Sequence, residues 1–375
     1  MRNGFIYTDA YTDFDYGPTH PLKVIRLKLT YELIQAYGLL NLPHVQSIQP
    51  ERANEEDLTV FHSLDYLDAL RHANSQGFGK SLYQYGLGPG DNPIFEGLYD
   101  WSLWVTGATL QAAGYVAGKD YDIVFSIGGG LHHAQSDRAS GFCYINDAAV
   151  AISKLIQQGK RIAYVDIDAH HGDGVQKAFY RTDRVLTISL HETGHTLFPG
   201  TGFEEETGEG DGEGYSVNLP VPPFTADDVY LWAFEEVVPP LIEAFKPDLV
   251  FTQLGVDTFI QDPLANLHLT IFGFERIVHR LKELAPRWVA LGGGGYDISN
   301  VARAWALAWA VMNDVELDDA LPEAYVETSA RWGIHEKRLR EGFSGASQTQ
   351  DPSVRPDVER VVNYLKRNVF PKVRG

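Results

Sequence analysis

The amino-acid sequence predicts an α/β fold in which helices cover both faces of an open, mostly parallel β-sheet. Short runs of β-branched and aromatic residues alternate with longer stretches of helical periodicity, as in a series of strand–helix units. Several short runs, such as Ile123-Val124-Phe125 and Leu249-Val250-Phe251, are continuously apolar. Strands have this composition when both faces of their sheet are buried.

The predicted elements follow one another along the whole chain. Strands are expected at residues 4–8, 122–127, 161–168, 184–191, 248–255 and 287–292. Helices are expected at residues 27–40, 101–117, 147–158, 226–244, 274–284 and 300–312, with a last amphipathic helix near 358–368. The segment 77–93 carries five glycines, two prolines and no helical periodicity. Connectors of that length are often functional.

Composition restricts the class of protein. The 375 residues are predicted to form one domain over residues 1–320, with a C-terminal extension over 321–375 packed on it. The single cysteine excludes an intrachain disulfide and any cysteine-based zinc cluster, and it favours a reducing, cytoplasmic location. We expect no signal peptide and no membrane span. The net charge of −19 favours cationic ligands and disfavours direct binding of nucleic acid.

Residues able to perform acid–base or metal chemistry gather at the ends of five predicted strands. They are His132, His133, Asp166, Asp168, His170, Asp173, His191, Asp257 and Tyr296. Ligands of open α/β sheets bind beyond the carboxyl ends of the strands. The sequence therefore predicts one site that several separate segments build together.

A metal site is predicted within this set. Asp168 and His170 are two residues apart, so in extended backbone their side chains point to the same face. Asp257, from another strand, can complete a triad of two carboxylates and one imidazole. Three protein ligands with open positions are typical of catalytic sites. Zinc and iron(II) both suit this donor set.

The paired histidines and the tyrosine suggest a division of labour. One of His132 and His133 can take a proton from a water at the metal, and the other can stabilise charge or protonate a leaving amine. The sequence does not distinguish the two. Asp166 and Asp173 can orient these rings from behind. Tyr296 follows four glycines and can donate to a carbonyl oxygen, as an oxyanion-hole group does.

Two other motifs are assigned no catalytic role. His191-Glu192-Thr193-Gly194-His195 has the H-E-x-x-H spacing of zinc proteases, but that motif requires a helix and here it follows a predicted strand. Cys143 lies in the apolar run Gly141-Phe142-Cys143-Tyr144-Ile145. We expect it to be a small buried residue of the core rather than a nucleophile.

These motifs together resemble those of the zinc-dependent histone deacetylase family, particularly its bacterial members, the acetoin-utilisation proteins and histone-deacetylase-like amidohydrolases. The resemblance runs from about Tyr16 to Leu317. It rests on Gly129-Gly130-Leu131-His132-His133-Ala134, Gly141-Phe142-Cys143-Tyr144-Ile145-Asn146-Asp147, Asp166-Ile167-Asp168-Ala169-His170-His171-Gly172-Asp173-Gly174, Phe198-Pro199-Gly200-Thr201-Gly202 and Gly292-Gly293-Gly294-Gly295-Tyr296. It implies an arginase-like fold and hydrolysis of acyl groups from lysine side chains of proteins or peptides.

The resemblance also implies a role for each site residue. The metal, zinc or iron(II), would be bound by Asp168, His170 and Asp257. His132 and His133 would form the acid–base pair, backed by Asp166 and Asp173, and Tyr296 would polarise the acyl carbonyl. The implied substrate-binding residues are Asp91 at the rim, Phe142, Phe198 and Leu264 on the tunnel wall, and Gly141 and Gly294. Arg26 would lie below the site, near the exit for acetate.

Structural potassium or sodium ions are implied as well. The first ion would be held by Asp166, Asp168, His170, Ser189 and Leu190, and the second by Phe179, Thr182, Val185 and Tyr215. Leu264 stands where polyamine-deacetylating relatives carry a glutamate, which favours acyl-lysine over acetylpolyamines. Pro263 stands where eukaryotic class I relatives carry an arginine used with an inositol phosphate, so we expect that regulation to be absent.

Other functions remain open at this point. A deacetylase of acetylpolyamines or other small amides would use the same residues. A ureohydrolase of the arginase type would share the fold but need a second metal and more carboxylates. A non-enzymatic acyl-lysine reader would bind without turnover. Physiological substrate, acyl preference and oligomeric state cannot be derived from the sequence.

Overall fold

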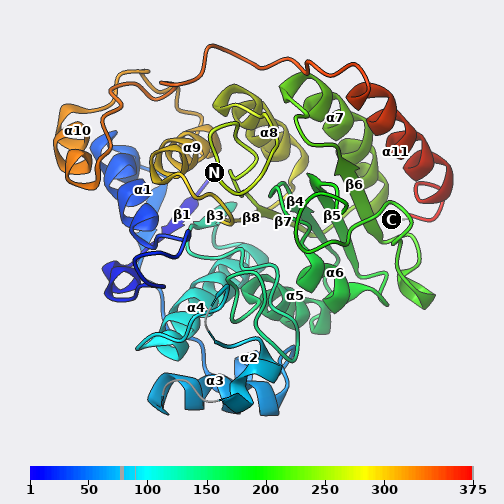
Figure 1. Cartoon of the computed structure of the whole chain (residues 1–375), viewed down its shortest axis with the longest axis horizontal. Coiled ribbons are helices and arrows are strands. Elements are labelled where there is room, and N and C mark those ends of the chain that lie inside the picture. The colour runs from blue at the N-terminus through cyan, green and yellow to red at the C-terminus, as the bar shows by residue number, and fades with distance from the viewer. Residues whose placement is uncertain (77–79, 89, 374–375) are drawn as a thin grey trace.

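Eight parallel strands form one sheet in the computed structural model, which describes residues 1–76, 80–88 and 90–373 (Figure 1). The strand order is β2-β1-β3-β8-β7-β4-β5-β6. The strands are β1 (Asn3–Ile6), β2 (Val45–Ile48), β3 (Ile123–Ser126), β4 (Ile162–Asp166), β5 (Val185–Glu192), β6 (Ser216–Val221), β7 (Leu249–Gln253) and β8 (Trp288–Leu291). Because all pairs are parallel, the carboxyl ends of the strands meet at one edge.

The six predicted strands are confirmed, and the two that the sequence did not reveal are the edge strands of the sheet. In β2, Gln46 and Ser47 are exposed, so the strand lacks a continuous apolar run. In β6, Pro220 argues against a central strand, and the structure places β6 at the edge, where proline is tolerated. The predicted strand 161–168 ends at Asp166, so the residues that follow belong to a loop.

Helices cover both faces of the sheet. The α-helices are α1 (Ile25–Ala36), α2 (Glu55–Leu58), α3 (Leu64–Gln76), α4 (Leu98–Ala117), α5 (Asp147–Gln157), α6 (Asp173–Phe179), α7 (Asp227–Phe245), α8 (Ile271–Leu284), α9 (Ile298–Met312), α10 (Glu323–Ser329) and α11 (Val354–Asn368). α1, α9, α8, α7 and α11 pack side by side above the sheet in Figure 1, and α4, α5 and α6 pack below it. The predicted α/β class is confirmed.

Helix boundaries differ from the prediction at several points. The helix expected at 27–40 ends at Ala36, because Gly38 adopts a left-handed conformation with φ of 74°. α11 begins at Val354, earlier than expected, since Pro356 falls in its first turn, where no backbone donor is needed. α2, α3, α6 and α10 were not predicted. In the segment 77–93, residues 80–85 form a 3₁₀ helix, η3 (Lys80–Tyr85), and residues 77–79 and 89 lie outside the described part.

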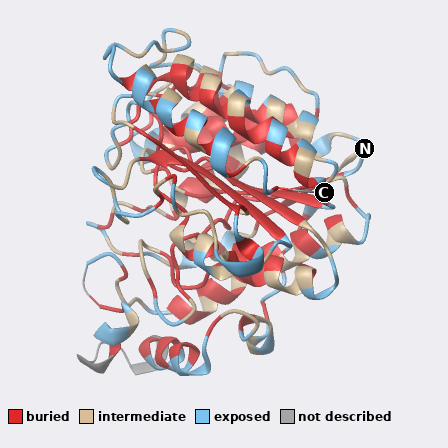
Figure 2. Ribbon diagram, turned by 90° about the vertical axis from the view of Figure 1, so that its right-hand side faces the viewer, coloured by how far each residue is buried: buried red, intermediate tan, exposed pale blue. Residues whose placement is uncertain are grey.

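The sheet is the most deeply buried layer of the molecule. Figure 2 shows its strands edge-on between the two helical layers. Trp288, Trp305 and Trp309 are among the largest fully buried side chains. α10 packs against α1, and α11 packs against α7 and β6, while a division of the chain at residue 320 stays a prediction. No helix in the described residues is long and apolar enough to cross a membrane.

Candidate metal and catalytic site

Three ligand-bearing side chains converge at the carboxyl edge of the sheet. Asp168 and His170 lie in the loop between β4 and α6, and Asp257 follows β7. Their ligand atoms all lie within 4.8 Å of one another. Nδ1 of His170 is 3.1 Å from Oδ1 of Asp168 and 3.0 Å from Oδ2 of Asp257. The predicted triad is therefore brought together, although by a loop and not by extended backbone.

Backbone and amide donors fix the orientation of both carboxylates. Asp168 accepts hydrogen bonds from the side-chain amide of Gln253 at 2.5 Å and from the N–H of Gly294 at 2.8 Å. Asp257 accepts one from the N–H of Ala169 at 2.8 Å. Oδ1 of Asp168, which also accepts the N–H of His170 at 3.0 Å, and Oδ2 of Asp257 face Nδ1 of His170. Such supporting groups are what a metal ligand needs to hold its geometry.

The charges of the triad suit a cation. Asp168 and Asp257 are at most 1% exposed, and two buried carboxylates this close need a compensating positive charge. Burial alone would lower the pKa of His170, but hydrogen bonds to both carboxylates raise it well above its usual value. Burial and the charge of Asp168 raise the pKa of Asp257 to about 6. The donor set, two carboxylates and one imidazole, fits zinc or iron(II).

Glycines make room for the triad. A Cβ atom on Gly294 would stand 2.1 Å from Oδ2 of Asp257 and 2.6 Å from Oδ2 of Asp168. A Cβ on Gly141, whose φ is +51°, would stand 2.4 Å from Cδ2 of His133. Both glycines that the resemblance assigns to substrate binding therefore lie against the site, and neither position tolerates a side chain.

The two histidines of the loop after β3 face each other across one hydrogen bond. Nε2 of His132 lies 3.0 Å from Nε2 of His133. Behind them, Nδ1 of His132 donates to Asp166 and Nδ1 of His133 donates to Asp173, each at 2.7 Å. An ionised carboxylate can only accept, which assigns a proton to both Nδ1 atoms. Each predicted His–Asp pair is present.

Their surroundings drive the two rings to opposite protonation states. Burial lowers the pKa of both rings. For His132, the charges of Asp166 and Asp168 outweigh burial and raise the pKa to about 9. For His133, burial and the positive charge of His132 lower the pKa to about 4. At neutral pH, His132 is the protonated partner and His133 the neutral one.

Tyr296 lies next to His170 of the triad. Its ring centre lies 6.5 Å from that of His170 and 5.7 Å from that of Phe142, edge to face. Burial and the charges of Asp257 and Asp168 raise the pKa of the phenol well above its usual value. The hydroxyl therefore stays protonated and can act as a donor at neutral pH.

A buried carboxylate holds the tyrosine and its neighbouring loop. Asp262 accepts hydrogen bonds from the N–H of Tyr296 at 2.8 Å and from the N–H of Leu264 at 2.9 Å. Burial and the charge of Asp257 raise the pKa of Asp262 to about 8. Sequence reasoning assigned no role to Asp262, and its only signal was an acidic residue shortly before Leu264.

Two aromatic rings flank the site. The Phe198 ring lies 5.0 Å from that of His133 and remains 44% exposed. Phe142 contacts Tyr296 and His20, whose ring is 4.5 Å away. Leu264 is half-buried. Phe142 and Phe198 therefore lie beside the catalytic residues, and Leu264 lies on the loop that Asp262 joins to Tyr296. That the three residues line one opening stays a prediction.

Asp91 and Arg26, assigned to the rim and the base of the site, both lie close to residues of the centre, while their roles stay predictions. Asp91 is exposed, and its carbonyl oxygen is bonded to Nε2 of His20 at 3.2 Å, next to Phe142. Arg26 is 5% exposed and donates to the carbonyl oxygen of Gly295 at 2.8 Å. Arg26 therefore lies directly behind Tyr296.

The residues assigned to monovalent ions fall into two neighbourhoods. Asp166 and Ser189 are register partners on β4 and β5, and the carbonyl oxygen of Leu190 accepts from the hydroxyl of Tyr230 at 3.2 Å. Phe179, Thr182 and Val185 follow one another from the end of α6 to the start of β5, and Tyr215 directly precedes β6. Ion binding at either place stays a prediction.

Several supporting residues were missed. The hydroxyl of Tyr164 donates to Asp166 at 2.8 Å, and the side-chain amide of Gln135 donates to Asp173 at 2.9 Å. The side chain of Asn146 caps α5 and donates to the carbonyl oxygens of His132 and Ala134, both at 3.1 Å. Only the last had a recognisable signal, an Asn-Asp pair preceding a helix.

The two motifs set aside on sequence grounds lie outside the metal cluster. His191 and Glu192 are the last residues of β5, and His191 bonds to Ser189 and to the carbonyl oxygen of Gly202. A zinc-protease helix is therefore absent from these described residues. Cys143 is buried, and burial raises the pKa of its thiol well above the usual value, as expected for a core residue.

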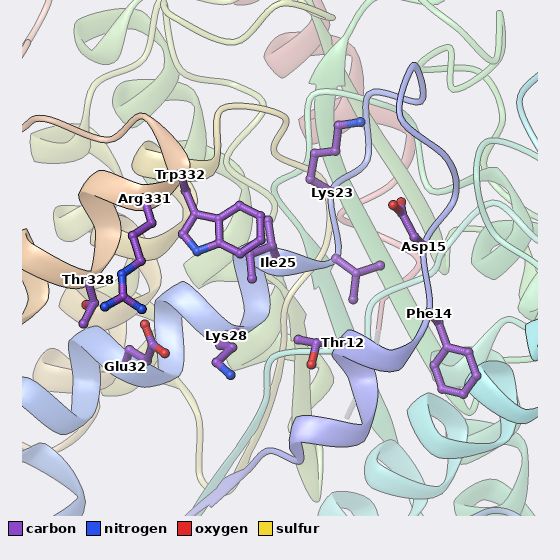
Figure 3. A pocket seen from close by; sticks show the side chains of 11 residues that line it. Thr12, Phe14, Asp15, Lys23, Ile25, Lys28, Glu32, Thr328, Arg331 and Trp332 are labelled. Atoms are coloured by element: carbon purple, nitrogen blue, oxygen red, sulfur yellow. The ribbon is translucent and has the colours of Figure 1, made fainter.

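A separate cavity of about 590 Å³ opens between the start of α1 and the segment after α10 (Figure 3). Phe14 and Trp332 border it together with Lys23 and Lys28. None of the predicted catalytic or metal-binding residues lines it. Lys23 already donates to two backbone carbonyl oxygens, and Lys28 pairs with Asp9. The cavity is distinct from the catalytic centre.

Comparison with known proteins agrees with this geometry. A family model described as "Histone deacetylase domain" matches residues 20–312. Histone deacetylase B of Dictyostelium discoideum is 41% identical over 312 residues, which cover 83% of this chain and 73% of that protein. Acetoin utilization protein AcuC of Bacillus subtilis (strain 168) is 39% identical over 338 residues, covering 87% and 86%. The crystal structure of a histone deacetylase homolog complexed with SAHA has a TM-score of 0.89 and 34% identity, covering 98% of this chain and 100% of that one.

Proposed function

Because the chain belongs to the histone deacetylase family and is thus a deacetylase of the amidohydrolase type, we propose that it removes acetyl or other acyl groups from lysine side chains of proteins or peptides. One observation carries the proposal: a buried metal-ligand triad, a histidine pair with opposed protonation states, a tyrosine and two aromatic rings lie together at the carboxyl edge of the sheet.

Asp168, His170 and Asp257 would hold the catalytic metal, zinc or iron(II). When bound, such an ion supplies Lewis acidity for the amide carbonyl and lowers the pKa of water. The described residues offer one cluster of three such ligands. That number supports one divalent ion and disfavours the two-metal chemistry of a ureohydrolase.

His133 is the proton acceptor in this proposal. It is neutral at neutral pH, and its Nδ1 proton is committed to Asp173. Its one lone pair, at Nε2, faces Nε2 of His132, so it takes a proton from water only when that contact opens. His132 is held protonated by Asp166. It would keep the pair's positive charge beside the reacting amide and supply the proton that the leaving lysine nitrogen needs.

Tyr296 would donate from its hydroxyl to the oxygen of the scissile amide. The raised pKa keeps that proton on the phenol. The bond strengthens as negative charge develops on the oxygen, which is how oxyanion-hole donors accelerate acyl transfer.

The opening favours a long, slender substrate. Phe142 and Phe198 present apolar faces beside the metal cluster, which suits the methylene chain of a lysine. Leu264 offers no charge to a second amine, so an acetylpolyamine finds no partner there. An exposed carboxylate at Asp91 is available to peptide N–H groups at the rim.

A turnover panel tests the proposal. Acyl-lysine peptides and acetylpolyamines are supplied to the full chain after metal removal and after reloading with zinc or iron(II). We expect acyl-lysine peptides to be the better substrates, no turnover after chelation, and recovery with one ion per chain. Full activity of the metal-free protein would contradict the assigned site, and a preference for acetylpolyamines would contradict the substrate class.

A further inference from the structure

Glu192 is a buried carboxylate that the mechanism above does not use. It is the last residue of β5, and only 1% of its surface is exposed. Its side chain accepts three hydrogen bonds from neutral donors. They come from the Thr196 hydroxyl at 2.9 Å, the Asn266 N–H at 2.8 Å and the Asn266 side-chain amide at 3.1 Å.

These donors belong to the two loops that carry wall residues of the opening. Thr196 lies two positions before Phe198, and Asn266 lies two positions after Leu264. The loops are more than sixty residues apart in sequence, and the Glu192 carboxylate joins them. One side chain therefore connects the two walls.

Both loops also contact the reacting groups. The Phe198 ring packs against that of His133 at 5.0 Å. The Leu264 loop is bonded through Asp262 to the backbone of Tyr296. The N–H of Glu192 itself donates to the carbonyl oxygen of Ala169, between two metal ligands, at 2.9 Å.

Because this carboxyl group is buried, displacing either loop from it is energetically unfavourable. A buried ionised group that loses a donor suffers a large desolvation penalty, and hydrogen bonds to charged groups contribute more than neutral ones. Moving either loop away from Glu192 would leave a buried carboxyl oxygen without its hydrogen-bond donor. The carboxylate therefore favours one spacing of the two loops.

We propose that Glu192 is a positioning residue that sets the spacing of the Phe198 and Leu264 walls and thereby the fit of the acyl-lysine chain between them. The inference rests on the proposed function, because it assumes that the substrate chain occupies this opening. Glu192 touches neither the metal triad nor the histidine pair through its side chain, so it acts through the walls.

Two metal-binding probes of different length distinguish the fit of a chain between the Phe198 and Leu264 walls from binding to the metal itself. A linear hydroxamate with a six-carbon chain would lie between the walls, whereas acetohydroxamate has no chain to place there. Dissociation constants for both are measured on the zinc-loaded full chain and on Glu192→Ala. We expect the long hydroxamate to bind about tenfold more weakly to the variant, the equivalent of one charge-assisted hydrogen bond. Acetohydroxamate should change by less than about twofold, with zinc content unchanged.

Further variants exclude a general loss of structure. Glu192→Gln keeps the shape of the side chain and one acceptor. Its affinity for the long hydroxamate should therefore lie between those of the wild type and Glu192→Ala. Glu205→Gln, at an exposed position of a nearby loop, is the matched control and should bind both probes as the wild type does. If Glu192→Ala does not fold, the comparison is made with Glu192→Gln and Thr196→Val.

The decisive result is the coupling between Thr196 and Glu192. Thr196→Val should weaken binding of the long hydroxamate about threefold in the wild type, and should have no further effect when Glu192 is already alanine. Equal weakening of both probes, or independent effects of the two substitutions, would overturn the proposal while leaving the function intact. Failure of both probes to bind the zinc-loaded wild type would instead contradict the proposed function.

Discussion

His62 provides a direct test of how the loop behind the histidine pair is held. Its side chain is 2% exposed, and its Nε2 accepts the backbone N–H of Asn146 at 3.0 Å. Asn146 in turn caps α5 and bonds the carbonyl oxygens of His132 and Ala134. The Nε2 atom must stay unprotonated to accept, and burial lowers the pKa of His62 to about 3.

The size of the effect follows from the two protonation states. In the unfolded chain a histidine has a pKa of about 6.5. Below that pH the unfolded state takes up a proton that the folded state refuses until about pH 3, so stability falls as the pH is lowered through this window. At pH 5 the uptake is nearly one proton, which corresponds to about 1.3 kcal/mol per pH unit and a cumulative loss of about 2 kcal/mol relative to pH 7.5.

The substitution His62→Gln removes this proton uptake while keeping an acceptor for the Asn146 N–H. Urea unfolding of the zinc-loaded protein at pH 7.5, 6 and 5 measures the free energy of unfolding for both proteins. The variant should lose about 2 kcal/mol less than the wild type between pH 7.5 and pH 5. His279→Gln, at an exposed position on α8, is the control and should follow the wild type. If the free energy of unfolding falls equally with pH in the wild type and in His62→Gln, the reasoning is refuted.

Three further substitutions probe the catalytic centre. Tyr296→Phe should lower kcat on an acetyl-lysine peptide by about 10²–10³, the usual effect of losing one oxyanion donor, and near-normal turnover would contradict its role. Gly294→Ala should abolish zinc binding, because the added Cβ would stand 2.1 Å from Oδ2 of Asp257. A zinc content of one per chain in this variant would contradict the expected clash. Asp262→Asn should lower kcat about tenfold with zinc retained, since an amide can accept only one of the two N–H groups bonded there. Unchanged kcat would show that the Tyr296 backbone needs no such support.

Buried, continuously apolar strands were predictable because their composition reflects their surroundings on both faces. β3 and β7 are of this kind, and both were found at the expected positions. The edge strands β2 and β6 carry polar residues and a proline, so their sequences resemble loops. Knowing where the central strands end was enough to place the triad and the histidine pair, because parallel strands deliver their carboxyl ends to one edge.

The supporting residues could not be predicted in the same way. Tyr164, Gln253 and Glu192 act on partners 2 to 85 residues away, and no spacing rule connects a donor with a carboxylate across a fold. The assignment of base and acid also required the structure. His132 and His133 are adjacent and chemically identical in the sequence. Their pKa values differ because Asp166 and Asp168 raise that of His132, whereas burial and the charge of His132 lower that of His133.

The charges of the centre favour a divalent cation over a monovalent one at the triad. The protonated His132 offsets Asp166. Asp168 and Asp257 remain, and both are buried beside a single imidazole. A doubly charged ion cancels both charges and frees the imidazole to be a neutral ligand, whereas a singly charged ion would leave one buried carboxylate without a counter-charge. The acid–base pair depends on these charges as well. Asp166 and Asp168 favour the charged form of His132, and burial together with the charge of His132 keeps His133 neutral.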